Sequence, residues 1–107
     1  TAFFDDLHEH GRGENVLMYL FSEFGRRVHD NGSGTDHGAA GASFVIGDMV
    51  KGGMYGEYPS RKAEDLEQGD LVPNYDFRGA YSSIVEYWMG LDAKPIVNGN
   101  FEKLAFL

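Results

Sequence analysis

The sequence contains no cysteine and no strongly basic stretch, and both absences exclude classes of site. Without cysteine, the chain cannot form a disulfide framework, a thiolate zinc site or a cysteine nucleophile. Only 9 Lys and Arg residues stand against 17 Asp and Glu residues, which gives a formal net charge of -8. Proteins that bind nucleic acid neutralise its phosphates with clustered positive charge, so nucleic acid is not an expected partner.

Long hydrophobic runs are absent as well. A membrane-spanning helix needs about 20 consecutive apolar residues, and no stretch approaches that length, so no transmembrane segment is expected in this chain. The first six residues lack the basic and apolar regions of a signal peptide, although the chain starts at Thr1, so a signal in the parent gene stays open. With 107 residues and 42% hydrophobic composition, we expect one globular unit, residues 1–107.

The pattern in the first half predicts one helix and two strands. Residues 2–10 carry apolar residues at helical spacing and end before two glycines, which predicts a short amphipathic helix. Residues 16–21 form an almost unbroken apolar run, which favours a buried, parallel strand. Residues 25–41 are polar and glycine-rich and are expected to form a loop, and residues 43–47 form a second short apolar strand.

The second half predicts an irregular segment and then a helix. Residues 48–75 are punctuated by glycine and proline and are expected to be turns, with a possible short hairpin around Met54 and Tyr55. Asp76 is a natural N-cap, Gly90 is well placed to end the helix, and the apolar residues up to Leu107 can dock onto the body. The helical stripe itself comprises Phe77, Ala80, Tyr81, Ile84, Val85 and Trp88. The helices and strands together predict an α/β fold.

Two polar clusters frame the glycine-rich loop and are the candidates for chemistry. Glu23, Arg26 and Arg27 follow the first strand, where Glu can ligate a cation and Arg can bind phosphate or sulfate. The alternative is a Glu–Arg pair that neutralises a strand end. Asp36 and His37 offer an oxygen and a nitrogen ligand suited to zinc, manganese or iron, and the alternative is a capped turn with a solvated histidine.

Four segments in order resemble one family. They are residues 21–28 (Phe-Ser-Glu-Phe-Gly-Arg-Arg-Val), 34–38 (Gly-Thr-Asp-His-Gly), 50–56 (Val-Lys-Gly-Gly-Met-Tyr-Gly) and the helix from 76–78 (Asp-Phe-Arg) to 90–92 (Gly-Leu-Asp). The chain resembles the C-terminal portion of the "domain of unknown function 1501" family, which is related to the alkaline phosphatase and sulfatase superfamily. The resemblance implies a fragment of a layered α/β sheet with flanking helices. It also implies a missing N-terminal portion as partner and a periplasmic or extracellular location in the parent protein.

The resemblance further implies a metal-dependent phosphate or sulfate ester hydrolase-like protein that is incomplete by itself. Asp36 and His37 could be the superfamily's Asp-His ligand pair, yet they precede a strand. In the preferred alignment Glu23 takes the place of the ligand Asp and His37 that of a later ligand His, while Phe24 stands where a further ligand His is expected. Glu23, Asp36 and His37 are then the candidate ligands of a divalent metal, and Arg26 is the candidate catalytic residue. The alternative function is a non-catalytic exported or cell-surface binding protein that retains the hydrolase fold.

Overall fold

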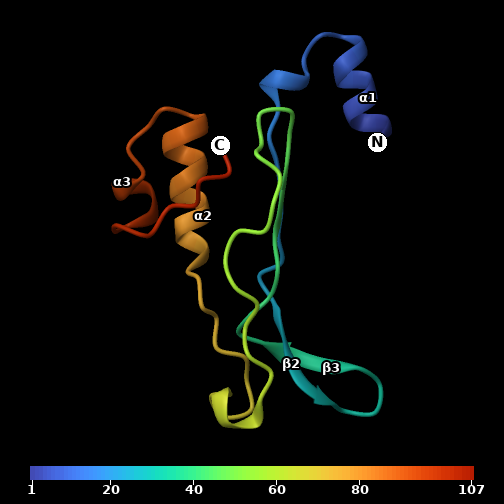
Figure 1. Ribbon diagram of the computed structural model, residues 1–107, viewed down its shortest axis with the longest axis vertical. Helices are drawn as coiled ribbons and strands as arrows, with labels where there is room; N and C mark the ends of the chain where they lie inside the picture. Colours follow the sequence, from blue (N-terminus) through green and yellow to red (C-terminus); the bar gives the residue numbers. More distant parts are fainter.

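Two antiparallel ribbons and a helical lobe make up the computed structural model, which describes residues 1–107 (Figure 1). Strand β1 (Met18–Leu20) pairs with β4 (Phe44–Ile46), and β2 (Gly25–Asp30) pairs with β3 (Thr35–Gly38). The helices are α1 (Ala2–Glu9), α2 (Phe77–Ser83) and α3 (Lys94–Val97), with short turns η1 (Gly13–Asn15), η2 (Ala63–Asp65) and η3 (Ile84–Trp88). These helices and strands confirm the predicted α/β class, although the two ribbons do not join into one sheet.

The first helix forms where its pattern predicts it. The Thr1 side chain accepts a hydrogen bond from the Phe4 backbone N–H at 3.5 Å, and Phe4 is the buried residue of α1. His8 Nε2 lies 2.8 and 2.9 Å from the two carboxylate oxygens of Asp48, which connects α1 to the turn after β4. The histidines of this helix therefore have local structural partners, since His10 Nδ1 lies 2.8 Å from the Asp6 carbonyl oxygen.

The strand predicted over residues 16–21 is present, but the expectation that it is buried and parallel was wrong. Its regular part, β1, pairs antiparallel with β4, and Tyr19 lies opposite Val45. Its last residue, Leu20, is 44% exposed. The error has a physical cause, because a short apolar run fits a buried strand and a strand of an open ribbon equally well. The predicted second strand is confirmed as β4.

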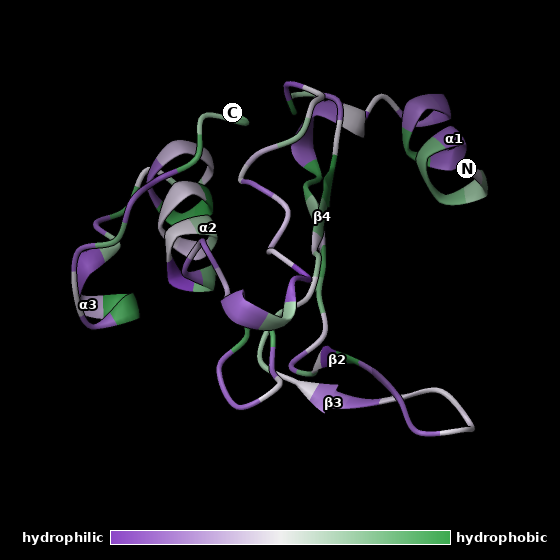
Figure 2. Cartoon of the chain, turned by 60° about the horizontal axis from the view of Figure 1, so that its bottom comes forward, coloured by the Kyte–Doolittle hydropathy of each residue, from purple (hydrophilic) through white to green (hydrophobic).

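The polar segment predicted as a loop folds instead into the β2–β3 hairpin. Its turn is made by Asx contacts: the Gly32 N–H donates to Asp30 Oδ1 at 2.7 Å, and the Ser33 N–H donates to Asn31 Oδ1 at 2.9 Å. Gly32 has φ 95°, a conformation that strongly favours glycine. The hairpin extends from the lower end of the ribbon as an arm (Figure 1), and it is largely hydrophilic (Figure 2).

The predicted helix after Asp76 is confirmed. The Asp76 carboxylate accepts from the Arg78 backbone N–H at 2.9 Å and caps α2. The helix then widens into the π turn η3, in which the Met89 N–H donates to the Ile84 carbonyl oxygen at 3.1 Å. Gly90 follows with φ 68° and ends the helical segment.

The C-terminal tail docks onto this helix, as predicted. Phe106 is only 2% exposed, and its carbonyl oxygen accepts from the Lys51 N–H at 2.8 Å. The Leu104 N–H donates to Ser83 Oγ at 2.8 Å. The segment around Met54 has no paired strands, so the predicted hairpin there was wrong. Residues 48–75 contain regular structure only in η2 and in a bridge between Glu67 and Asp70.

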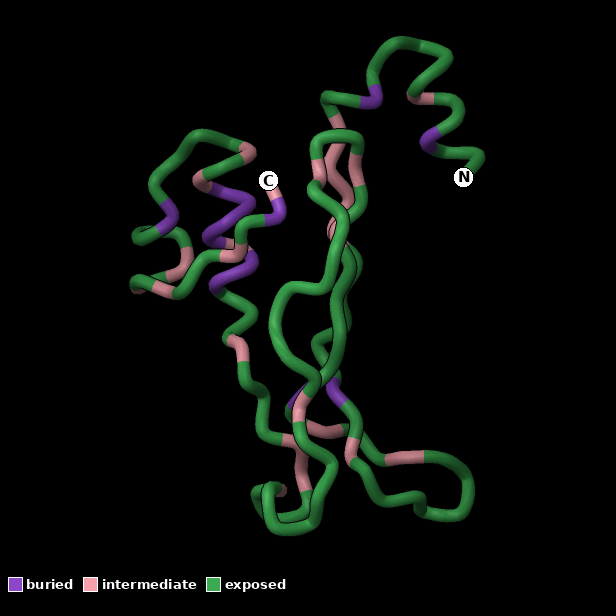
Figure 3. The backbone as a smooth tube through the Cα atoms, viewed as in Figure 1, coloured by how far each residue is buried: buried purple, intermediate pink, exposed green.

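The buried core is small for a chain of this length. Only 12 of 107 residues are buried, and half of them lie in α2 and η3 (Figure 3). The radius of gyration is 16.6 Å, whereas a compact domain of this length has about 13 Å. No helix combines the length and apolarity needed to cross a membrane. Much of the apolar surface of this chain therefore lies outside its own core.

Candidate functional site

The β2–β3 arm carries three of the four predicted site residues, and Glu23 precedes it. In the hairpin register Arg26 lies opposite His37, so these two side chains belong to the same face of the ribbon. Arg26 Nη1 donates to the Thr35 carbonyl oxygen at 2.7 Å. The structure thus brings the predicted anion-binding residue and one predicted metal ligand together.

His37 has a defined orientation because its ring stacks on Phe24. The ring centroids are 4.2 Å apart and the planes are inclined by 10°. Phe24 is itself 51% exposed, so the stack stands on the surface of the arm. The Phe24 ring therefore limits His37 to fewer orientations while leaving the imidazole accessible from outside.

Asp36 is separated from His37 by the alternation of the strand. Consecutive residues of a strand point to opposite faces, so Asp36 and His37 on β3 cannot address one ligand from the same side. Asp36 Oδ1 accepts from Asn31 Nδ2 at 2.7 Å, which commits the carboxylate to the turn. Glu23 is exposed on the segment that leads into β2.

These residues do not by themselves fit a complete metal site. No group of three or more His, Cys, Asp or Glu side chains in the chain is arranged to hold a metal ion. Zinc in proteins takes at least three protein ligands. Glu23, Asp36 and His37 therefore stay predicted ligands, and a metal centre that used them would need further ligands.

The base of the arm is held by Arg27, which the sequence suggested as a second anion-binding guanidinium group, and by Asp70 and Gly25, which it did not single out. Arg27 donates to the Gln68 carbonyl oxygen, and Asp70 Oδ1 accepts from the Ala39 N–H at 3.0 Å. Gly25 is buried at this base, and a Cβ there would collide with the backbone of Ala40. The local sequence gave no signal for these contacts, because they join segments about 30 to 40 residues apart.

Perturbed ionisation occurs away from the arm, around α2 and the tail. Hydrogen bonding to Arg78 lowers the pKa of the Asp76 carboxyl, and the same pair raises the pKa of Arg78. A hydrogen bond to Glu86 raises the pKa of Lys103, and burial raises the pKa of the Tyr75 phenol, which donates to the Glu102 carbonyl oxygen. Each group has a structural partner, so these shifts reflect helix capping and tail docking.

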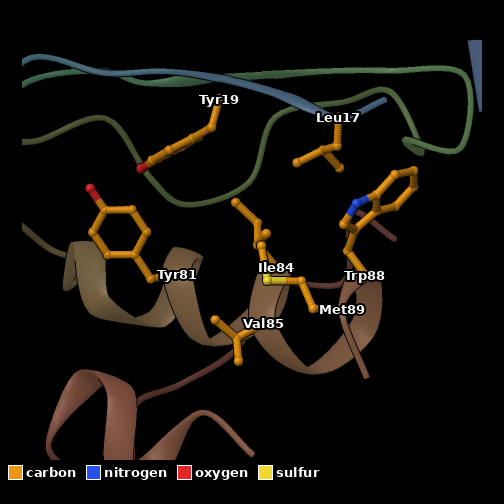
Figure 4. Close-up of a pocket in the computed structure, with 7 residues that line it drawn as sticks. All are labelled: Leu17, Tyr19, Tyr81, Ile84, Val85, Trp88 and Met89. Carbon is orange, nitrogen blue, oxygen red and sulfur yellow. The ribbon is translucent and has the colours of Figure 1, made fainter. Parts of the chain in front are cut away.

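Apart from the arm, a cavity lies between the β1 segment and the helical lobe. It is an open cavity of about 300 Å³, and all of its lining residues are hydrophobic. Side chains from the two segments face each other across it (Figure 4). The lining residues are Leu17, Tyr19, Tyr81, Ile84, Val85, Trp88 and Met89. The stripe from Tyr81 to Trp88 was predicted as a core face, but its pairing with Leu17 and Tyr19 could not be read from local sequence.

Comparison with known proteins adds one family. The family model described as "Protein of unknown function (DUF1501)" matches residues 1–98 of the chain. No curated protein matches. No solved structure matches either.

Proposed function

The chain belongs to the DUF1501 family, whose description is "Protein of unknown function", and we propose that it is part of a metal-dependent phosphate or sulfate ester hydrolase-like protein. In this proposal the 107 residues are a C-terminal piece of an alkaline-phosphatase-like layered domain, and the parent protein is periplasmic or extracellular. The piece is incomplete by itself. A further portion of the same polypeptide supplies the remaining metal ligands.

The pairing of Arg26 with His37 on one face of an exposed arm is the observation that carries this proposal. A guanidinium group can bind the non-bridging oxygens of a phosphate or sulfate through two parallel hydrogen bonds. Arg26 Nη1 donates one hydrogen bond to the Thr35 carbonyl oxygen, and this bond holds the guanidinium group beside β3. An imidazole on the same face can act as a metal ligand or as a proton donor at near-neutral pH.

The substrate class follows from the charge of these residues. Phosphate and sulfate esters are anions, and Arg26 is a permanent cation on an otherwise acidic chain of net charge -8. A local cation on an acidic surface favours anions at one point and repels them elsewhere. This distribution supports a small anionic substrate bound at the arm more than a polyanion that runs along the surface.

The alternative function is a non-catalytic exported or cell-surface binding protein that retains the fold. The division of Asp36 and His37 between opposite faces favours it, because the two predicted ligands then serve different surfaces. An exposed arm with a stacked Phe24–His37 pair could equally contact a sugar or a protein surface. The two functions differ in two measurable properties, which are metal content and ester hydrolysis.

The decisive experiment measures metal and hydrolysis in the complete gene product. Inductively coupled plasma mass spectrometry and a screen of phosphate and sulfate esters are applied to the unaltered protein and to a Glu23→Ala/His37→Ala variant. A Glu64→Ala/His29→Ala variant removes the same residue types at exposed positions and serves as control. We expect stoichiometric zinc, manganese or iron that is lost only in the first variant, together with hydrolysis. If the parent protein contained no metal and hydrolysed no ester, the hydrolase proposal would be rejected in favour of the binding function.

A further inference from the structure

The apolar cavity between β1 and the helical lobe is built to receive apolar side chains. Its lining contains no charged residue. The Tyr19 hydroxyl, one of its few polar groups, donates to Ser43 Oγ at 3.2 Å and is thereby partly satisfied. Binding sites for small molecules place a few polar groups so that they orient the ligand. A cavity lined by seven hydrophobic residues offers little such orientation and suits the side chains of a packed protein surface.

Aromatic packing gives this cavity a fixed shape on one side. The Tyr19 and Tyr81 ring centroids lie 5.5 Å apart in an edge-to-face arrangement, and Phe21 stacks beside Tyr19 at 5.5 Å. Trp88 of η3 bounds the side away from Tyr19 and Tyr81, and Met89, the residue after η3, also lines the cavity (Figure 4). Met89 is 58% exposed, so it stands at the rim where an incoming surface would first make contact.

The accessible surface of the chain indicates how large a molecule is needed to cover the cavity and the surface around it. The chain exposes 7856 Å² at a mass of 11.9 kDa, whereas a compact monomer of that mass exposes about 5,900 Å². The excess is roughly 1,900 Å², more than twice the roughly 800 Å² that each partner buries in a standard interface. A single apolar molecule in a cavity of about 300 Å³ cannot cover this area. A folded polypeptide surface can.

We propose that this cavity and the adjoining β1–β4 ribbon form the docking surface for a further portion of the same polypeptide, which inserts apolar side chains between β1 and η3. The inference rests on the proposed function, because the same 107 residues leave both a core and a predicted ligand set incomplete. One additional body that packs here and extends to the β2–β3 arm completes both. A second copy is disfavoured because each copy carries a net charge of -8 and brings the same incomplete ligand set.

Site-specific photo-crosslinking in the complete gene product tests this proposal. Met89 is replaced by p-benzoylphenylalanine, and Ile96 is replaced in the same way as the control. The two residues are 58% and 59% exposed, but only Met89 lines the cavity. After irradiation, mass spectrometry identifies the crosslinked peptides. We expect Met89 to crosslink within one molecule to peptides outside residues 1–107, in clearly higher yield than Ile96.

Three results would overturn the proposal. They are crosslinks that join two copies through residues 1–107, an adduct with a lipid or other non-peptide molecule, and a Met89 yield no higher than that of Ile96. A second pair of variants, Met89→Glu and Ile96→Glu, guards against a local effect of the crosslinker. Docking predicts a melting temperature lowered by several degrees for Met89→Glu only, because a charge at a closed apolar interface loses its hydration.

Failure of docking and failure of the hydrolase proposal give different results. The crosslinks do not depend on metal or turnover, so they persist in an inactive protein if the docking is correct. Conversely, metal content and hydrolysis that depend on Glu23 and His37 would survive a negative crosslinking result, since neither residue lines the cavity.

Discussion

Ser83 should contribute more to stability than its neighbour Ser82, although both are buried serines on one helix. Ser83 is 0% exposed and Ser82 is 3% exposed. Ser83 Oγ donates to the Gly79 carbonyl oxygen at 2.8 Å and accepts from the Leu104 N–H at 2.8 Å. Ser82 Oγ only donates, to the Arg78 carbonyl oxygen at 2.8 Å. The substitution Ser83→Ala therefore removes the one hydroxyl that joins α2 to the C-terminal tail.

The magnitude follows from which backbone group each substitution leaves unpaired. Each substitution loses one hydroxyl bond to a helix carbonyl, worth about 0.5–1.5 kcal/mol, and this loss cancels in the comparison. Ser83→Ala also takes the acceptor from the part-buried Leu104 N–H, and an unsatisfied buried donor costs about 1–3 kcal/mol. Alanine raises helix propensity by roughly 0.5 kcal/mol at both positions, so this gain cancels in the comparison. We expect Ser83→Ala to lower the free energy of unfolding by at least about 1 kcal/mol more than Ser82→Ala.

Urea unfolding followed by circular dichroism measures the two free energies, and amide hydrogen exchange localises the change. The exchange of the Leu104 amide should accelerate in Ser83→Ala and remain unchanged in Ser82→Ala, because only the first loses its acceptor. Equal destabilisation by the two substitutions, or unchanged Leu104 exchange in Ser83→Ala, would refute the reasoning.

Two further predictions concern the same helix. Asp76→Asn keeps the capping oxygen but loses the charge that pairs with Arg78. Hydrogen bonding to Arg78 lowers the pKa of Asp76 in the folded protein. The unaltered protein should therefore be more stable than the variant above about pH 5, and this advantage should decline as the pH falls past the unfolded-state pKa of about 3.9 and through the lower folded-state pKa. Thermal unfolding between pH 2 and 7 checks this, and a pH-independent difference would contradict it. Gly79→Ala should destabilise the protein although alanine is the better helix former by about 1 kcal/mol, because its Cβ would collide with the Glu102 carbonyl oxygen. The control Gly52→Ala, where no atom lies within 4 Å of the new Cβ, should be near neutral in the same thermal assay, and a stabilised Gly79→Ala variant would contradict the packing argument.

Local sequence information predicted the elements whose signals are themselves local. The cap at Asp76 and the apolar stripe through Trp88 predicted the second-half helix correctly, because capping and helical periodicity act within a few turns. The docking of the apolar tail was also predicted, and Phe106 is buried. Helix α1 follows the same rule, with Thr1 as its cap.

The arrangement of strands could not be predicted in this way. The orientation of β1 depends on its pairing with β4, more than 20 residues later in the sequence, and a short apolar run contains no signal for that choice. The β2–β3 hairpin was missed for another reason. Its strands are polar and exposed, so they lack the hydrophobic alternation of a strand, and their register depends on Asx contacts of Asp30 and Asn31 in the turn.

For the candidate site, the sequence identified the residues but did not show which face of the β2–β3 hairpin each one occupies. Arg26 and His37 are eleven positions apart and are brought together by hairpin register, whereas the adjacent Asp36 and His37 are separated by strand alternation. The hydrolase hypothesis placed all of these residues at one site, and the hairpin register brings Arg26 and His37 to one face while Asp36 points to the other.

Because the arm lies apart from the core, effects of substitutions on chemistry can be distinguished from effects on overall stability. The contacts that hold the arm come from Arg27, Gly25 and Asp70 at its base, whereas Glu23 and His37 are exposed, and His37 stacks on Phe24 within the arm. The Glu23 substitution should change stability by less than about 0.5 kcal/mol, and loss of the Phe24–His37 stack should cost about 0.5–1.5 kcal/mol at the arm. Loss of metal or activity in Glu23→Ala/His37→Ala can then be attributed to chemistry at the arm. The same separation means that the Ser83 and Gly79 variants, which act on the core, should leave the geometry of the Arg26–His37 face unchanged.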